Sequence, residues 1–209
     1  MSTPSEARGD TISTAVRQVR EHRVIRAAIH CACNVLDRVE ATGTVADPDL
    51  FDLLTFFGTY VESWHVEYEE AVLLPFLYRT FGDFMSEPMQ RVLTEHEGSR
   101  GEWRAVDAAY HLVQAGDPGA FANLATSFRR YLERLGEHVR TEDGYLINAL
   151  DTILTPEEHD DLETRIVAVE ARSFGRGMPA LLEEKVRRLC ATCGAHWPFH
   201  DDPSAVLPR

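Results

Sequence analysis

Residues 65–74 read HVEYEEAVLL, and residues 138–147 repeat the pattern as HVRTEDGYLI. In both stretches a carboxylate follows the histidine by four residues, so His65 and Glu69, like His138 and Glu142, fall on one face of a helix. A pair of apolar residues closes each stretch one turn later. The repeat therefore predicts two related helices, each offering an imidazole and a carboxylate on the same side.

Four stripes of apolar residues run through and around this repeat, and they predict four long helices because they recur at steps of three and four residues. The stripes are Ala15, Val19, Ile25, Ile29, Cys33 and Leu36; Leu54, Val61, Tyr68 and Val72; Met85, Met89, Val92, Trp103, Val106 and Tyr110; and Leu124, Phe128, Tyr131, Leu135, Tyr145 and Ala149. Glycine, aspartate and proline separate them, and no segment alternates like a strand. The predicted fold class is all-α, an up-down-up-down four-helix bundle with a C-terminal helical extension.

The last part of the chain differs from the bundle in amino-acid composition and in its helix-start and helix-end residues. A fifth helix is expected to start with Thr155 as N-cap and Pro156 at its first position, and to end before Gly175. A short helix around Leu181 to Leu189 and a proline-rich end follow. We therefore expect a bundle domain over residues 10–152 and a helical extension with a tail over 153–209.

Charge and length restrict the possible functions. The 209 residues carry 21 Lys+Arg and 34 Asp+Glu, a formal charge of −13, which disfavours binding to nucleic acid or to an anionic membrane surface. Uncharged runs fall well short of the roughly 20 residues that a membrane helix needs, and the polar start has no apolar signal segment. Four cysteines are too few for a disulfide scaffold of this size. We expect a cytoplasmic protein.

Each of the four stripes is interrupted by one histidine near its middle. A single histidine on an apolar face is most often a core residue, but one per helix, with two carboxylates one turn away, is typical of a metal site. Carboxylates can bridge two cations, and a mixed nitrogen and oxygen set in a four-helix core suits a pair of iron or manganese ions. A single zinc would need only four ligands. The candidate ligands are His22, His65, Glu69, His96, His138 and Glu142.

Around these residues the sequence resembles the hemerythrin-like family with the HHE cation-binding domain, over roughly residues 10–152. The motifs that carry the resemblance are Glu21-His22-Arg23-x-Ile25, His65-x-x-x-Glu69-Glu70 followed by Leu74-Pro75, Glu95-His96, and His138-x-x-x-Glu142-Asp143. The resemblance implies a four-helix bundle around two iron ions, oxo- or hydroxo-bridged, with the six candidate residues as ligands. It also implies a small ligand such as oxygen, peroxide or nitric oxide.

Two positions depart from the oxygen-carrying members that the chain resembles. Those carriers have a fifth histidine one turn after the third-helix histidine, where this chain has Arg100. Their fourth-helix carboxylate comes five residues after its histidine, which here would be Asp143, although the internal repeat favours Glu142. With four histidines and two bridging carboxylates, each six-coordinate iron would keep about one exchangeable position, which favours redox turnover over reversible carriage. Arg26 and Arg100 could attract an anionic ligand or pair with carboxylates.

The sequence leaves three functional classes open. The first is a non-heme di-iron protein that binds, senses or reduces a small oxidant. The second is an iron-dependent interaction or regulatory module, which the extension beyond the bundle favours and which could form a homodimer. The third, a reversible oxygen carrier, is disfavoured by the missing histidine. Tyr68 and Tyr145 are candidates for the surroundings of the metal.

The tail contains a second group of metal-binding residue types. Cys190, Cys193, His196 and His200 fall within one short segment, so a small zinc site is possible. A redox-active pair of Cys190 and Cys193 is an alternative. The third possibility is that the cysteines stay reduced while Trp197 and Phe199 pack on the bundle or on a second subunit.

Overall fold

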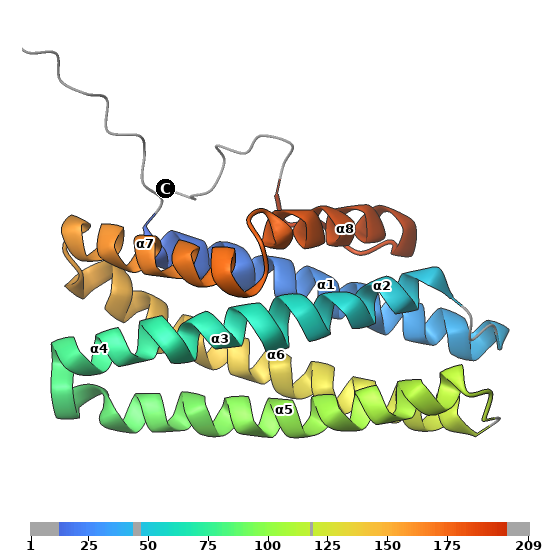
Figure 1. Ribbon diagram of the computed structural model, residues 1–209. Coiled ribbons are helices and arrows are strands. Elements are labelled where there is room, and N and C mark those ends of the chain that lie inside the picture. Colours follow the sequence, from blue (N-terminus) through green and yellow to red (C-terminus); the bar gives the residue numbers. More distant parts are fainter. Residues whose placement is uncertain (1–12, 44–46, 118, 200–209) are drawn as a thin grey trace, which may run out of the picture.

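The computed structural model describes residues 13–43, 47–117 and 119–199, and every regular element in these ranges is a helix. Four long helical runs lie side by side, and two further helices cover one side of them (Figure 1). The runs are α1 (Thr14–Thr42), residues 48–81, α5 (Ser86–Gln114) and α6 (Ala120–Ile153). The predicted all-α fold class is thus confirmed. Within the described ranges, no helix has the length and apolar character that crossing a membrane requires.

The second run is a chain of short helical segments that continue one another. Its parts are α2 (Pro48–Phe56), η1 (Phe57–His65), α3 (Val66–Tyr68), η2 (Glu69–Leu73) and α4 (Leu74–Phe81). The segments η1 and η2 are π-helical, since the N–H of Val66 donates to the carbonyl of Val61 and that of Leu74 to the carbonyl of Glu69. Such wide turns are frequently found at functional sites. Here one ends at His65 and the other begins at Glu69.

The helix ends follow from local sequence. Ser13 caps α1 by accepting from the N–H of Val16, and α1 ends at Gly43, whose φ of 67° favours glycine. At the start of α2, Asp47 is the N-cap and accepts from the N–H of Asp49, and Pro48 is the first helical residue. Figure 1 shows α1 and α2 meeting at the same end of the bundle as α5 and α6. At the opposite end the 3₁₀ turn η3 (Gly82–Met85) joins α4 to α5.

The extension forms α7 (Pro156–Ser173) and α8 (Met178–Cys193). Thr155 caps α7 together with Glu158 in a capping box, as the sequence predicts for its start. The extension is bound to the bundle by buried polar contacts. Arg17 of α1 pairs with Glu163 of α7, and Glu183 of α8 accepts from both Arg20 and Tyr60.

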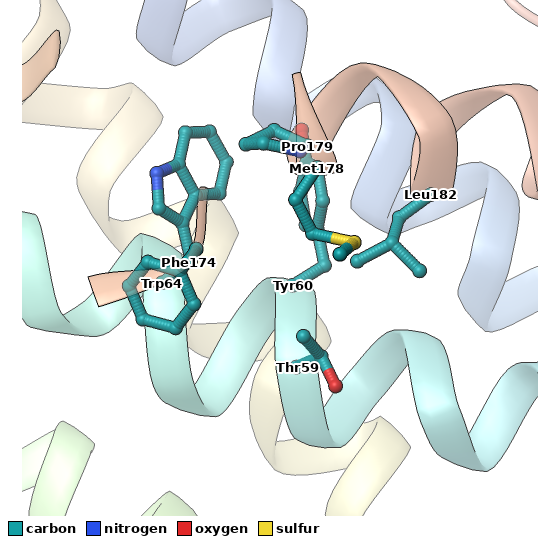
Figure 2. Close-up of a pocket in the computed structure, with 7 residues that line it drawn as sticks. All are labelled: Thr59, Tyr60, Trp64, Phe174, Met178, Pro179 and Leu182. Atoms are coloured by element: carbon teal, nitrogen blue, oxygen red, sulfur yellow. The ribbon is translucent and has the colours of Figure 1, made fainter. Parts of the chain in front are cut away.

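Apolar packing also joins the extension to the bundle. Ile166 and Val169 of α7 and Val186 of α8 belong to the same hydrophobic cluster as the bundle core. Figure 2 shows a shallow apolar pocket at this junction, where Tyr60 and Trp64 of η1 face Leu182 and the turn before α8. Trp197 and Phe199 pack on the same cluster, in agreement with one of the three possibilities that the sequence leaves for the tail. The division into domains at residue 152 stays a prediction.

A polar layer divides the interior of the bundle into two hydrophobic clusters. On α6 the larger cluster ends at Val139 and the smaller one begins at Leu146. In the run 48–81 the change falls between Tyr68 and Leu73, and on α1 the smaller cluster includes Ala15 while the larger begins at Val24. The candidate ligands lie in the gap between the two clusters.

Candidate metal centre

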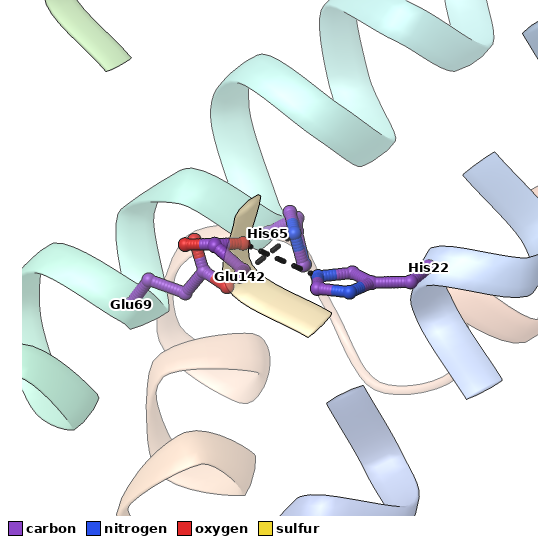
Figure 3. Close-up of side chains that lie close together, drawn as sticks. All are labelled: His22, His65, Glu69 and Glu142. Atoms are coloured by element: carbon purple, nitrogen blue, oxygen red, sulfur yellow. Dashed lines mark ion pairs between the residues drawn. The ribbon is translucent and has the colours of Figure 1, made fainter. Parts of the chain in front are cut away.

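Four helical runs bring the six predicted residues into one buried layer. None of them is more than 2% exposed. Their nitrogen and oxygen atoms form two groups, each with all its candidate ligand atoms within 4.8 Å of one another. One group is His22, His65, Glu69 and Glu142, and the other is Glu69, His96, His138 and Glu142. Figure 3 shows the first group, with side chains from α1, from the run 48–81 and from α6 pointing toward one another.

Both glutamates belong to both groups, and the contact distances show why. Glu69 lies between two imidazoles, with an oxygen 3.4 Å from Nε2 of His65 and the other 3.3 Å from Nε2 of His96. Glu142 lies between the other two, 3.3 Å from Nε2 of His22 and 3.4 Å from Nε2 of His138. Glu69 thus offers one oxygen to each group, whereas Glu142 approaches both groups with the same oxygen, Oε2. Both carboxylates are shared by the two groups, as a carboxylate bridge between two cations requires.

The outward nitrogen of every imidazole is held by a second carboxylate. The contacts of Nδ1 are His22 with Asp143 (2.7 Å), His65 with Glu21 (2.9 Å), His96 with Glu70 (2.9 Å) and His138 with Glu95 (3.0 Å). A carboxylate accepts hydrogen bonds, so Nδ1 donates in each case and Nε2 keeps a free lone pair in the neutral ring. A ligating histidine in a metalloprotein is typically oriented in this way.

The inner atoms of the layer have no hydrogen-bond partner. The four Nε2 atoms, one oxygen of Glu69 and both oxygens of Glu142 are buried and unsatisfied. Polar groups left in this state cost free energy unless something pairs with them. A cation at the centre would satisfy all of them at once, so the residues present fit a metal site.

The imidazoles and carboxylates of the layer shift one another's pKa values. Burial on its own would lower the pKa of His22, but the nearby carboxylates of Asp143 and Glu142 raise it to about 10. His96 behaves in the same way, with Glu69 and Glu70 raising its pKa to about 10 against burial. Without a cation, the raised pKa values favour protons on these imidazoles, which would offset the charge of the buried carboxylates. A bound metal would displace these protons, because its ligands must be deprotonated.

The supporting carboxylates repeat the internal symmetry of the sequence. Glu21 precedes His22 on α1 and holds His65 of the next helix, as Glu95 precedes His96 and holds His138. The motifs that carry the family resemblance contain both glutamates, but the sequence alone gives them no role. The signal for this role is visible in the sequence, since Glu21 directly precedes His22 and Glu95 directly precedes His96.

The two residues that follow the shared glutamates act in the same supporting role. Glu70 comes after Glu69 and holds His96, while Asp143 comes after Glu142 and holds His22. Of the two carboxylates that the sequence leaves open, Glu142 lies in the central layer, whereas Asp143 contacts the outer nitrogen of an imidazole. Arg26 pairs with Asp143 and Arg100 pairs with Glu70 at 2.9 Å, so both arginines are partners of carboxylates.

Two further side chains complete the surroundings of the layer. Gln18 donates from its amide to Glu69 at 2.9 Å. The hydroxyl of Tyr68 donates to Glu21, the carboxylate that holds His65. The prediction that Tyr68 lies beside the site is therefore correct, whereas the side chain of Tyr145 lies outside the described residues.

The structure does not support the predicted zinc site in the tail. His200 lies outside the described residues, and the cysteines with His196 form no cluster of metal-ligand geometry in the part that is described. The helix α8 continues as far as Cys193, and it thereby buries Cys190 against α1. The sulfur of Cys190 there lies 3.4 Å from that of Cys31.

An all-α bundle with a buried layer of imidazoles and shared carboxylates defines a class of helical metal-binding proteins. Comparison with known families agrees, because residues 15–150 match the family described as the hemerythrin HHE cation binding domain. The chain belongs to this family. Neither the curated proteins nor the solved structures gave a significant match.

Proposed function

We propose that the protein is a non-heme di-iron protein that binds, senses or reduces a small oxidant such as oxygen, peroxide or nitric oxide. The observation that carries the proposal is the pair of four-residue groups that share Glu69 and Glu142. Two overlapping groups suit two cations better than one. Mixed imidazole and carboxylate ligands in a four-helix core are the donors that iron pairs use.

The proposed ligands are those inferred from the sequence: His22, His65, Glu69, His96, His138 and Glu142. A bound iron pair would supply electrons and exchangeable coordination positions for the oxidant. The protein would fix the imidazoles through Nδ1, keep Nε2 free and exclude bulk water. Because all six side chains are buried, the oxidant would have to be small.

A redox role is favoured over reversible oxygen carriage by the surroundings of Arg100. Its guanidinium is engaged by Glu70 at 2.9 Å, so it offers no substitute for a fifth imidazole. Each iron would then keep an exchangeable position. The second candidate is an iron-dependent regulatory module, and the observation in its favour is that α8 contacts α1 beside the layer through Arg20 and Glu183.

The test is iron loading under anaerobic conditions, followed by metal analysis and optical spectra as oxygen and then peroxide are added. The proposal predicts about two irons per chain and rapid, irreversible spectral oxidation. Oxygen uptake that reverses on degassing would support the carrier instead. Oxidation that leaves peroxide unconsumed but changes the contacts of α8, measured by hydrogen exchange, would favour the regulatory module. Failure to retain iron would contradict all three.

A further inference from the structure

A second reactive cluster lies away from the metal layer, where α8 packs on α1. Cys31 and Cys190 are both buried, and their sulfur atoms are 3.4 Å apart although the residues are far apart in the chain. Cys193, one turn further along α8, is half-buried and also interacts with the Cys31 thiol. Three thiols thus gather at the contact between the bundle and its extension.

We propose that Cys31 and Cys190 are an oxidant-modified thiol pair, which hydrogen peroxide converts into a disulfide that joins α8 to α1. A disulfide needs a sulfur separation of about 2.05 Å, so the observed contact requires an approach of only ~1.4 Å. The two helices already pack against each other through the main hydrophobic cluster. This inference does not depend on the metal.

A hydrogen bond joins the two thiols, and either sulfur can donate it. In the first step one of the two sulfurs, here that of Cys190, attacks peroxide as the thiolate. This sulfur takes one oxygen as the O–O bond breaks, giving a sulfenic acid and water.

The second step closes the bond. The sulfur of Cys31 attacks the sulfur of Cys190, the S–O bond breaks, and hydroxide leaves as water with the Cys31 proton. In sum, two thiols are oxidised to one disulfide and one peroxide is reduced to two waters. Cys190 is 3% exposed, and the half-buried Cys193 lies one turn further along the same helix.

The fourth cysteine provides an internal control. Cys33 lies two residues after Cys31, which on a helix turns its side chain to a different face. There its thiol lies near Arg129 and Asp37. Cys33 and Cys193 are both only half-buried, so replacing them should leave the fold intact.

The experiment treats the purified full-length chain with hydrogen peroxide, caps free thiols, and maps tryptic peptides without reduction. The expected product links peptide 27–38 to peptide 189–209 and is two hydrogen atoms lighter than the sum of the two peptides, each with its second cysteine capped. Each peptide contains two cysteines, so the assignment comes from the double variant Cys33→Ala/Cys193→Ala, which retains only the proposed pair. This variant should form the same cross-link at a rate within about twofold of the wild type.

Adding Cys190→Ala to that background should abolish the cross-link. The proposal is overturned if the double variant forms no cross-link, or if the wild type joins Cys190 to Cys193 within one peptide. It is equally overturned if oxidation stops at a sulfinic acid while Cys31 stays free. A thiol-specific oxidant such as diamide, used in parallel on metal-free protein, should give the same linked peptides.

Discussion

Each histidine of the central layer has two polar neighbours with different roles. The Nδ1 side is fixed by a carboxylate from another helix, and the Nε2 side faces the shared glutamates. Removing a shared glutamate would take oxygens from both groups, whereas removing a supporting carboxylate would only loosen one ring. The two kinds of substitution should therefore differ in magnitude.

Replacing Glu69 or Glu142 with alanine should cost the protein most of its iron and lower its melting temperature, because metal bound to the folded state stabilises it. Metal analysis and thermal unfolding of each variant measure the effect. Glu67→Ala is the control, since Glu67 is exposed on the same helical run. The ligand assignment fails if both glutamate variants retain full iron at the melting temperature of the wild type.

Replacing Glu95 with alanine should weaken metal affinity about 10–100-fold without abolishing binding, because His138 would lose the partner that orients it. Glu95→Gln should be milder, since the amide oxygen can still accept from Nδ1. Competition with a chelator gives the affinities, and Glu97→Ala on the exposed side of α5 should match the wild type. Equal affinities for all three variants would show that the supporting contact has no effect on the metal.

The sequence predicts which six residues meet, because one histidine interrupts each apolar stripe and the carboxylates follow by one turn. It does not predict which carboxylate holds which imidazole. That depends on which ring nitrogen faces a neighbouring helix, as for Glu21 of α1 and His65 of η1. Spacing along a single helix carries no information on the pairing between helices.

Among the elements, the run 48–81 departs most from expectation. The apolar stripe predicts one regular helix, whereas the structure inserts π turns before His65 and after Glu69. Apolar periodicity averages over several turns and does not reveal a local change from four-residue to five-residue bonding. The start of α7 was predictable in detail, because Thr155, Pro156 and Glu158 are local signals that need no tertiary contact.

Glu183 of α8 provides one of the polar contacts between the extension and the bundle. Glu183→Ala should destabilise the protein by about 1–3 kcal/mol, because the buried hydroxyl of Tyr60 and the guanidinium of Arg20 would lose their partner. Denaturant unfolding measures the loss, and Glu183→Gln should restore part of it. Glu184→Ala should behave like the wild type, since Glu184 contacts only surface arginines of its own helix among the described contacts. A Glu183→Ala variant as stable as Glu184→Ala would show that the contact contributes nothing.

At the scale of the whole molecule, the polar layer separates two hydrophobic clusters that would otherwise form one core. Burying two carboxylates and four imidazoles there is costly unless opposite charge is present. Neighbouring carboxylates raise the pKa of His22 and His96, which favours protons on these imidazoles when no metal is bound. Cations would supply opposite charge in the metal-bound state and would also satisfy the bare Nε2 atoms.

Removing the metal should therefore lower the stability of the entire chain rather than unfold one helix. At free metal about 100 times above Kd, binding stabilises the folded state by about 2.7 kcal/mol, or roughly 5–10 °C for a protein of this size. Calorimetry of metal-loaded and chelator-treated protein measures the difference. The double variant Glu69→Gln/Glu142→Gln should have the same melting temperature with and without metal. It removes the two shared carboxylates that would bind the cations while it keeps the shape of the side chains. A metal-dependent shift that persists in this variant would locate the stabilising cation outside the layer.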